Sequence, residues 1–132
     1  MTPTLTLVVY MAVLTWLTYM GGSLLRIKVW TWQGIVLGAG NRDNLPPATP
    51  MAGRADRTAR NTLENFVLFA ALALVAHAAG VTDPSVAQGA TLFFWSRVIY
   101  VAVYYAGIAW VRTVVWLAGI IGLVMMMMPL LK

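Results

Sequence analysis

The chain contains no cysteine and only one histidine, His77. Without cysteine it forms no disulfide, and it offers neither a thiol nucleophile nor a thiolate ligand for a metal. A single imidazole cannot build a site that needs several histidine ligands. We therefore predict no metal site, and any thiol chemistry has to come from a bound ligand rather than from a side chain.

Charge is also scarce. Only 10% of the 132 residues are charged and 61% are hydrophobic, whereas soluble domains carry roughly 25% charged residues. A run of ~20 apolar residues crosses a bilayer as a helix that satisfies its own backbone hydrogen bonds. Four such runs predict an all-α integral membrane protein. We expect residues 1–132 to form a single four-transmembrane-helix bundle with helices at about residues 5–25, 55–79, 86–106 and 110–131.

The cations gather in one part of the chain, between Arg26 and Arg60. Loops rich in Lys and Arg stay in the cytoplasm. The loop at residues 26–54 is therefore predicted to be cytoplasmic, with the N- and C-termini outside. No basic residue precedes the first apolar run, which favours a retained helix over a cleaved signal peptide. Because the cations lie in this loop and at helix ends, the net charge of +5 does not indicate nucleic-acid binding.

The long loop has two parts. Residues 38–50 are rich in Gly, Pro and Asn and are not expected to form regular helix. Before them, Trp30, Trp32 and Ile35 suit the membrane interface, where tryptophan prefers to lie. From about Ala52 the sequence is again compatible with helix, so the second membrane helix is predicted to begin near Arg54.

Charged residues in the second apolar helix need a partner or a function, because an ionisable group at membrane depth costs at least ~2.5 kcal/mol on insertion scales. Arg57, Asn61 and Glu64 are spaced i, i+4, i+7 and so share one helix face. Arg60 lies four residues before Glu64 and is placed to pair with it along the helix.

A second polar face is predicted on the third helix. Arg97, Tyr100 and Tyr104 are spaced i, i+3, i+7, and Arg112 opens the fourth helix on the same side of the membrane as Tyr104. Arg97 lies deeper, at a depth that Glu64 reaches. We therefore predict a structural ion pair between Glu64 and Arg97.

Each of these residues also has a simpler interpretation. Arg57 and Arg60 suit cytoplasmic flanks with snorkelling side chains, the tyrosines suit interfacial aromatic positions, and Asn61 suits a hydrogen bond between helices. These interpretations do not explain why several cations, an amide and a phenol converge on one side. That convergence favours a site for a polar anion.

Residues 57–66, Arg-Thr-Ala-Arg-Asn-Thr-Leu-Glu-Asn-Phe, resemble the signature of the MAPEG superfamily, the membrane-associated proteins in eicosanoid and glutathione metabolism. Residues 22–28, residues 97–104 and Arg112 are similar to the family as well. Members include microsomal glutathione transferases, leukotriene C synthase and microsomal prostaglandin E synthase. Residues 40–47 resemble the bacterial branch, which implies a bacterial inner membrane. One departure is Asn65, where some members carry an aromatic residue.

The resemblance implies a homotrimer that binds glutathione as a co-substrate between adjacent subunits, near the cytoplasmic face. The residues it assigns to glutathione binding are Arg26, Arg57, Arg60, Asn61, Glu64, Tyr100 and Tyr104. Arg112 matches the family arginine at the thiol and is the predicted catalytic residue. A lipophilic second substrate is expected to enter from the surrounding membrane lipids.

Two functions follow from this resemblance. The first is a glutathione-dependent transferase or peroxidase that adds glutathione thiolate to lipophilic electrophiles or reduces lipid hydroperoxides. The alternative is a non-catalytic family member that binds lipid or a partner. A small four-helix exporter is a third class, but such proteins usually need a carboxylate in the first helix, and residues 5–25 contain none.

Overall fold

The computed structural model describes all 132 residues as an all-helical chain. Four of its helices are long and apolar enough to cross a membrane. The fourth of these spans includes the short 3-10 turn η1 (Met128–Leu131), which continues the last α-helix. The all-α class and the four predicted spans are thereby confirmed. The helices are α1 (Pro3–Ile27), α2 (Trp32–Ala39), α3 (Pro50–Ala78), α4 (Pro84–Ala106) and α5 (Ala109–Met127).

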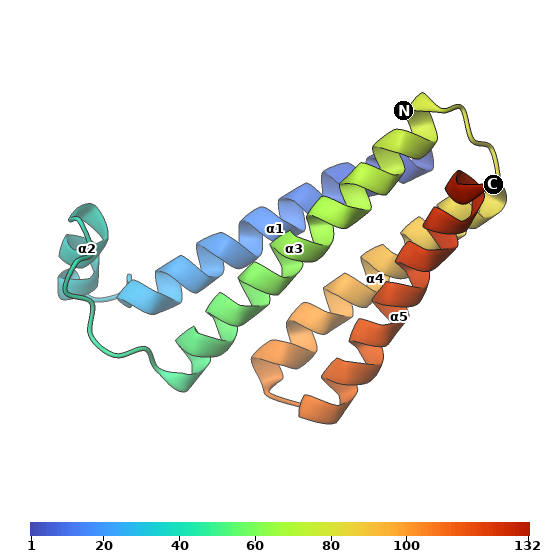
Figure 1. The fold of residues 1–132 in the computed structure, drawn as a ribbon. Coiled ribbons are helices and arrows are strands. Elements are labelled where there is room, and N and C mark those ends of the chain that lie inside the picture. Colours follow the sequence, from blue (N-terminus) through green and yellow to red (C-terminus); the bar gives the residue numbers. More distant parts are fainter.

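The four long helices form two antiparallel pairs. α1 packs on α3, α4 packs on α5, and the pairs meet mainly through α3 and α4 (Figure 1). Both termini lie at one end, beside the turn between α3 and α4. The opposite end, called here the loop end, carries the α4–α5 turn and the connection from α1 to α3.

The apolar core fills the half of the bundle nearer the termini. Met11, Phe69, Phe93 and Met126 from all four long helices are fully buried there, with the Phe69 and Phe93 rings stacked 4.6 Å apart. Towards the loop end the residues between the helices become polar. The fold therefore leaves the loop half of the bundle free for polar side chains.

The connection between α1 and α3 differs from the prediction in one respect. The expected irregular segment began at Gly38, but Gly38 and Ala39 close the short helix α2, which was not predicted. α3 begins at Pro50, somewhat before the expected start near Arg54, because Thr49 caps it by accepting a hydrogen bond from the backbone N–H of Ala52 (3.2 Å). Proline fits the first turn of a helix, where its missing N–H is not needed.

The turn at the terminal end is fixed by Asp83, which caps α4. Its carboxylate accepts hydrogen bonds from the Ser85 hydroxyl (2.7 Å) and the Ser85 backbone N–H (2.9 Å). These two bonds hold the pKa of the Asp83 carboxyl below its ordinary value, because they stabilise the charged form. At the loop end Gly107, with φ 77°, makes the tight turn from α4 to α5.

Glycine allows α4 and α5 to approach closely, which leads to a first prediction. A Cβ at Gly122 would lie 2.7 Å from the Gly89 carbonyl oxygen and 2.8 Å from the Phe93 amide nitrogen. Gly122→Ala should therefore lower the free energy of unfolding by about 1–3 kcal/mol, the usual effect of overpacking. Thermal unfolding in detergent measures this effect.

Gly21→Ala is the matched control for Gly122→Ala. A Cβ at Gly21, inside α1 about two turns before its end, would lie 3.5 Å from the Tyr105 hydroxyl, which is ordinary contact. This variant should unfold at or slightly above the wild-type temperature, because alanine favours helix over glycine. Equal unfolding temperatures for the two variants would contradict close packing of α4 against α5.

Candidate functional site

Five of the predicted site residues, contributed by α3, α4 and α5, line one open groove at the loop end. It consists of two adjoining cavities, of about 300 Å³ and about 120 Å³, which share Tyr104 and Arg112. The larger is lined by Asn61, Tyr100, Tyr104, Arg112, Thr113 and Trp116. The smaller is lined by Arg54, Arg57, Tyr104, Gly107, Ile108, Ala109 and Arg112. We call the two together the α3–α5 groove.

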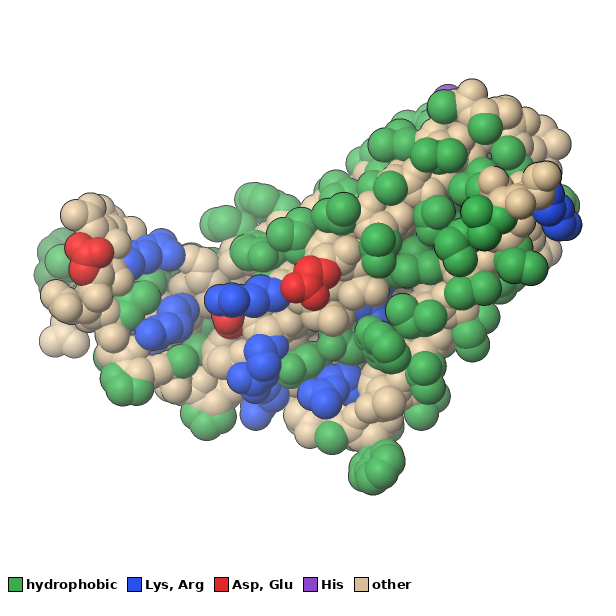
Figure 2. Space-filling view, viewed as in Figure 1, with side chains coloured by type: hydrophobic (Ala, Val, Ile, Leu, Met, Phe, Trp, Pro, Cys, Tyr) green, Lys and Arg blue, Asp and Glu red, His purple; other side chains and the backbone are tan.

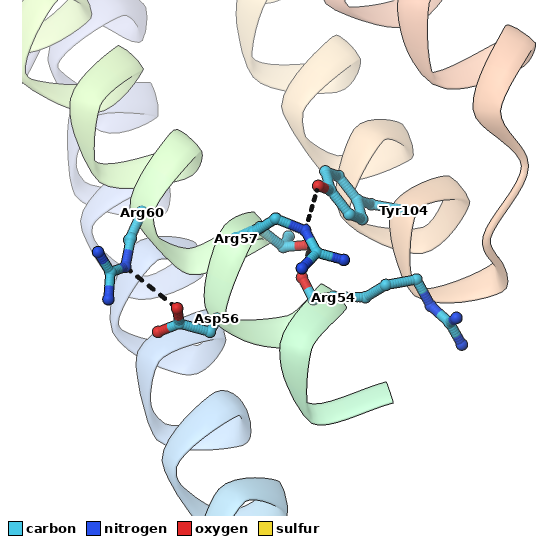
Figure 3. Close-up of polar contacts among 6 residues, drawn as sticks. Arg54, Asp56, Arg57, Arg60 and Tyr104 are labelled. Atoms are coloured by element: carbon cyan, nitrogen blue, oxygen red, sulfur yellow. Dashed lines mark hydrogen bonds and ion pairs between the residues drawn. The ribbon is translucent and has the colours of Figure 1, made fainter. Parts of the chain in front are cut away.

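Tyr104 holds two cations in this groove. The Nε of Arg57 donates a hydrogen bond to the Tyr104 hydroxyl across the gap between α3 and α4 (3.0 Å; Figure 3). The Arg112 guanidinium, from α5, lies 4.8 Å from the centroid of the Tyr104 ring, a cation–π distance. One phenol on α4 therefore positions an arginine from each neighbouring helix.

Asn61 is fixed deeper in the groove by two neighbours. The Nη1 of Arg97 donates to its side-chain oxygen (2.9 Å), and the Nδ2 of Asn65 donates to its backbone carbonyl (2.8 Å). The same Asn65 nitrogen lies 3.4 Å from the Asn61 side-chain oxygen. Since this oxygen already accepts from Arg97, the amide nitrogen of Asn61 is the group free to contact a ligand.

Arg97 is fully buried and lies behind the groove. Its guanidinium carbon is 4.4 Å from the Tyr100 ring centroid and 5.7 Å from that of Phe93. Its Nε and Nη2 have no hydrogen-bond partner. The buried charge is therefore stabilised by one neutral amide and two aromatic faces, and by no carboxylate of its own chain.

The ion pair predicted between Glu64 and Arg97 does not form within the chain, where Asn61 takes the place of Glu64. Glu64 lies three residues further along α3, which turns it ~60° away from the direction of Asn61, and it is exposed. The predicted ion pair between Arg60 and Glu64 does not form either. The one ion pair of the chain joins the Arg60 Nε to Asp56, one turn earlier (3.1 Å; Figure 3).

The remaining predicted residues lie outside the α3–α5 groove. Arg26 lines a separate cavity of about 190 Å³ between α1 and α3, together with Arg42, Asp56 and other residues. Arg60 and Glu64 lie on the exposed outer face of α3. Figure 2 shows basic side chains gathered over the loop half of the molecule and mostly hydrophobic surface over the other half. One chain thus does not bring Arg26, Arg60 and Glu64 into the α3–α5 groove.

The site predicted from the sequence does not include Arg54, which lines the groove, or Asn65, which donates a hydrogen bond to Asn61. Arg54 lines the smaller cavity and packs 3.8 Å from the position of a Cβ at Gly107, with a buried Nε that has no partner. From the sequence Arg54 marks only the approximate start of the second membrane helix, although its i, i+3, i+7 spacing to Arg57 and Asn61 places it on their face. Asn65 was noted only as a departure from the family.

The groove combines the groups needed to bind a polar anion within a membrane-spanning bundle. Arg54, Arg57 and Arg112 converge on it, and a guanidinium binds a carboxylate through two parallel hydrogen bonds. A cation beside a thiol also favours the thiolate. No group of three or more His, Cys, Asp or Glu side chains is placed to hold a metal ion.

Comparison with known protein families matches residues 1–131 to the MAPEG family. Neither the curated proteins nor the solved structures contain a match to the chain. The family match covers nearly every residue and agrees with the four apolar helices. The chain is therefore an integral membrane protein that belongs to the MAPEG family.

Proposed function

We propose that this protein is a glutathione-dependent membrane transferase and peroxidase that acts on lipophilic electrophiles and lipid hydroperoxides. The observation that carries the proposal is the arrangement around Tyr104, which holds Arg57 and Arg112 at the mouth of a polar groove. The family to which the chain belongs includes glutathione transferases and peroxidases as well as non-catalytic members.

The groove fits the chemistry of glutathione, which has two carboxylates, an ammonium group, amides and a thiol. Arg57 and Arg54 are suited to a carboxylate at the smaller cavity, and the free amide nitrogen of Asn61 is suited to a peptide carbonyl. Tyr100 lines the larger cavity beside Asn61. Arg112 is shared by both cavities, so it is placed between the carboxylate end and the part of the groove that faces Trp116.

We further propose that glutathione binds between the subunits of a homotrimer. Arg60 and Glu64 are charged, exposed and situated where the apolar part of α3 begins, an unfavourable position next to lipid. A subunit interface would cover them and bring them, with Arg26, to a neighbour's groove. Sedimentation in detergent should give the mass of three chains, and a stable monomer that still binds glutathione would contradict the interface.

Arg112 is the residue to which we assign the catalytic role. The thiolate sulfur of bound glutathione forms a bond to an electrophilic carbon, which either expels its leaving group or, at a polarised double bond, passes the electron pair to the neighbouring atom, which takes up a proton. In the peroxidase reaction, two glutathione molecules reduce a hydroperoxide to an alcohol and water and are themselves oxidised to a disulfide. The Arg112 cation stabilises the negative sulfur and lowers the pKa of the thiol from its free value of ~8.5. Tyr104 keeps this guanidinium in place by contact with its ring.

The proposed orientation places the loop end in the cytoplasm of a bacterium, with both termini outside the inner membrane. The absence of cysteine makes this simple to test. A cysteine introduced at Asn41 should react with a membrane-impermeant maleimide only after the cells are opened. Labelling of Asn41→Cys in intact cells would show that the protein has the opposite orientation.

Arg57→Ala should weaken glutathione binding about tenfold or more, because a hydrogen bond to a charged group contributes about 1.5–3 kcal/mol. Tyr104→Phe should weaken it less, since it removes only the hydroxyl that orients Arg57. Isothermal calorimetry measures both affinities. Lys132→Ala, at the opposite end of the bundle, is the control and should bind normally. An unaltered affinity in Arg57→Ala would exclude Arg57 from the site.

The experiment that tests the proposed function is an ultraviolet difference titration of the purified protein with glutathione at neutral pH, which follows thiolate formation. A saturable thiolate signal is expected. Binding by calorimetry without a thiolate signal would instead identify a non-catalytic member of the family. The absence of both signals would mean that glutathione is not the ligand.

A further inference from the structure

The short helix α2 carries an apolar face that no other part of the chain covers. Trp32, Ile35, Val36 and Ala39 follow the i, i+3, i+4, i+7 spacing of one helix face. All four are exposed, with Trp32 at 78% and Val36 at 56% of their full surface. α2 stands apart from the four long helices, beside the end of α1 (Figure 1). Its apolar face therefore points away from the protein.

The direction of this face is fixed by the packing on the opposite side of α2. Gly34 is buried there, and a Cβ at this position would collide with the carbonyl oxygens of Ile27 and Lys28 at the end of α1. A Cβ at Gly38 would lie 2.7 Å from the Ile27 side chain. Thr31 caps the helix by accepting from the Gly34 backbone N–H (3.0 Å). The two glycines thus let α2 seat closely on α1, so the helix cannot turn its apolar face inward.

The position and charge of this region identify what covers the face. α1 is a membrane span that ends at Ile27, so α2 follows the edge of the bilayer by only a few residues. With eight residues it is far too short to span the bilayer. Residues 26–42 contain three cations and no acidic residue: Arg26, Lys28 and Arg42. Basic residues beside an apolar helix face complement anionic lipid headgroups.

We propose that α2 lies in the membrane interface and binds anionic phospholipid there. Trp32, Ile35 and Val36 enter the boundary between headgroups and acyl chains, joined by the exposed Trp30. Lys28 and Arg42 contact the lipid phosphates. Arg42 also donates to the Ser23 hydroxyl on α1 (3.0 Å), so a lipid bound at this position is tied to the body of the bundle. This inference stands independently of glutathione binding.

The cysteine-free chain allows a direct test with single spin labels. Ile35→Cys and Val36→Cys place a label on the apolar face, and Gln33→Cys places one on an exposed polar position of the same helix. The proteins are reconstituted in phosphatidylcholine vesicles with and without phosphatidylglycerol. Collision with oxygen reports exposure to lipid, and collision with a water-soluble nickel chelate reports exposure to water.

With phosphatidylglycerol present, we expect the labels at positions 35 and 36 to collide with oxygen and to be protected from nickel, with the reverse at position 33. Removing the anionic lipid, or introducing Lys28→Gln with Arg42→Gln, should raise nickel access at position 35. Equal nickel access at positions 33 and 35 would place α2 in water and overturn the proposal. Protection of position 35 from both reagents would show a protein surface on α2 and overturn it as well. If nickel access at position 35 is the same with and without phosphatidylglycerol, the contact with anionic headgroups is excluded.

Discussion

Arg112→Ala is expected to abolish the thiolate signal of bound glutathione and to lower turnover by about 100-fold or more, while most of the binding affinity remains. Two effects combine. A thiol with a pKa of ~8.5 is only a few per cent ionised at neutral pH, so losing the cation lowers the amount of nucleophile by more than tenfold. The same cation stabilises the negative charge that develops on the electrophile or its leaving oxygen as the sulfur attacks, so its loss lowers the rate of the chemical step by a further factor.

Two controls separate this role of Arg112 from a loss of fold. Arg112→Lys keeps the charge but loses the flat guanidinium that stacks 4.8 Å from the Tyr104 ring, so it should retain part of the thiolate signal. The rate of Arg112→Ala should rise as the pH increases through ~8.5, because the free thiol then ionises without help. A full thiolate signal in Arg112→Ala would remove Arg112 from the mechanism.

The sequence predicted the parts of the fold that local physics determines. Lipid requires a spanning segment to satisfy its own backbone, so each long apolar run had to be a helix. Helical spacing likewise placed Tyr100 and Tyr104 on one face of α4, and both line the α3–α5 groove. These predictions depend on residues close in sequence, and the structure contains the same features.

The pairing of residues between helices could not be predicted in this way. Spacing put Asn61 and Glu64 on one side of α3, but it does not determine the rotation of α3 against α4. A rotation of ~60° decides which of the two meets Arg97, and in the structure it is Asn61. That rotation depends on packing between helices, which one sequence does not reveal.

The short helix α2 was missed for a related reason. Its eight residues include Gly34 and Gly38, and glycine is normally a signal against helix. Here the glycines provide close contact with the end of α1. Their role becomes visible only when the two elements are seen together.

Arg97→Met is expected to weaken glutathione binding about tenfold without lowering the unfolding temperature. The charge of Arg97 is fully buried, two of its nitrogens lack a partner, and its one hydrogen-bond acceptor is the neutral Asn61. Removing the Arg97 guanidinium therefore leaves no unpaired carboxylate behind. Under this condition, replacing a buried charged side chain with an apolar one is tolerated or stabilising. Asn61, however, loses its 2.9 Å contact and keeps only the longer one to Asn65. If Asn61 is no longer held in place, the ligand loses the hydrogen bond from the Asn61 amide nitrogen. One such neutral hydrogen bond contributes about 0.5–1.5 kcal/mol, which corresponds to up to roughly tenfold in affinity.

A double-mutant cycle shows whether Arg97 acts through Asn61. If Arg97 is a positioning residue, Arg97→Met should have no further effect on affinity in an Asn61→Ala background, because the group it orients is already gone. Additive losses would mean that Arg97 meets the ligand itself. A large fall in unfolding temperature for Arg97→Met alone would contradict the expected tolerance and would show that the contacts of Arg97 with Asn61, Tyr100 and Phe93 stabilise the bundle.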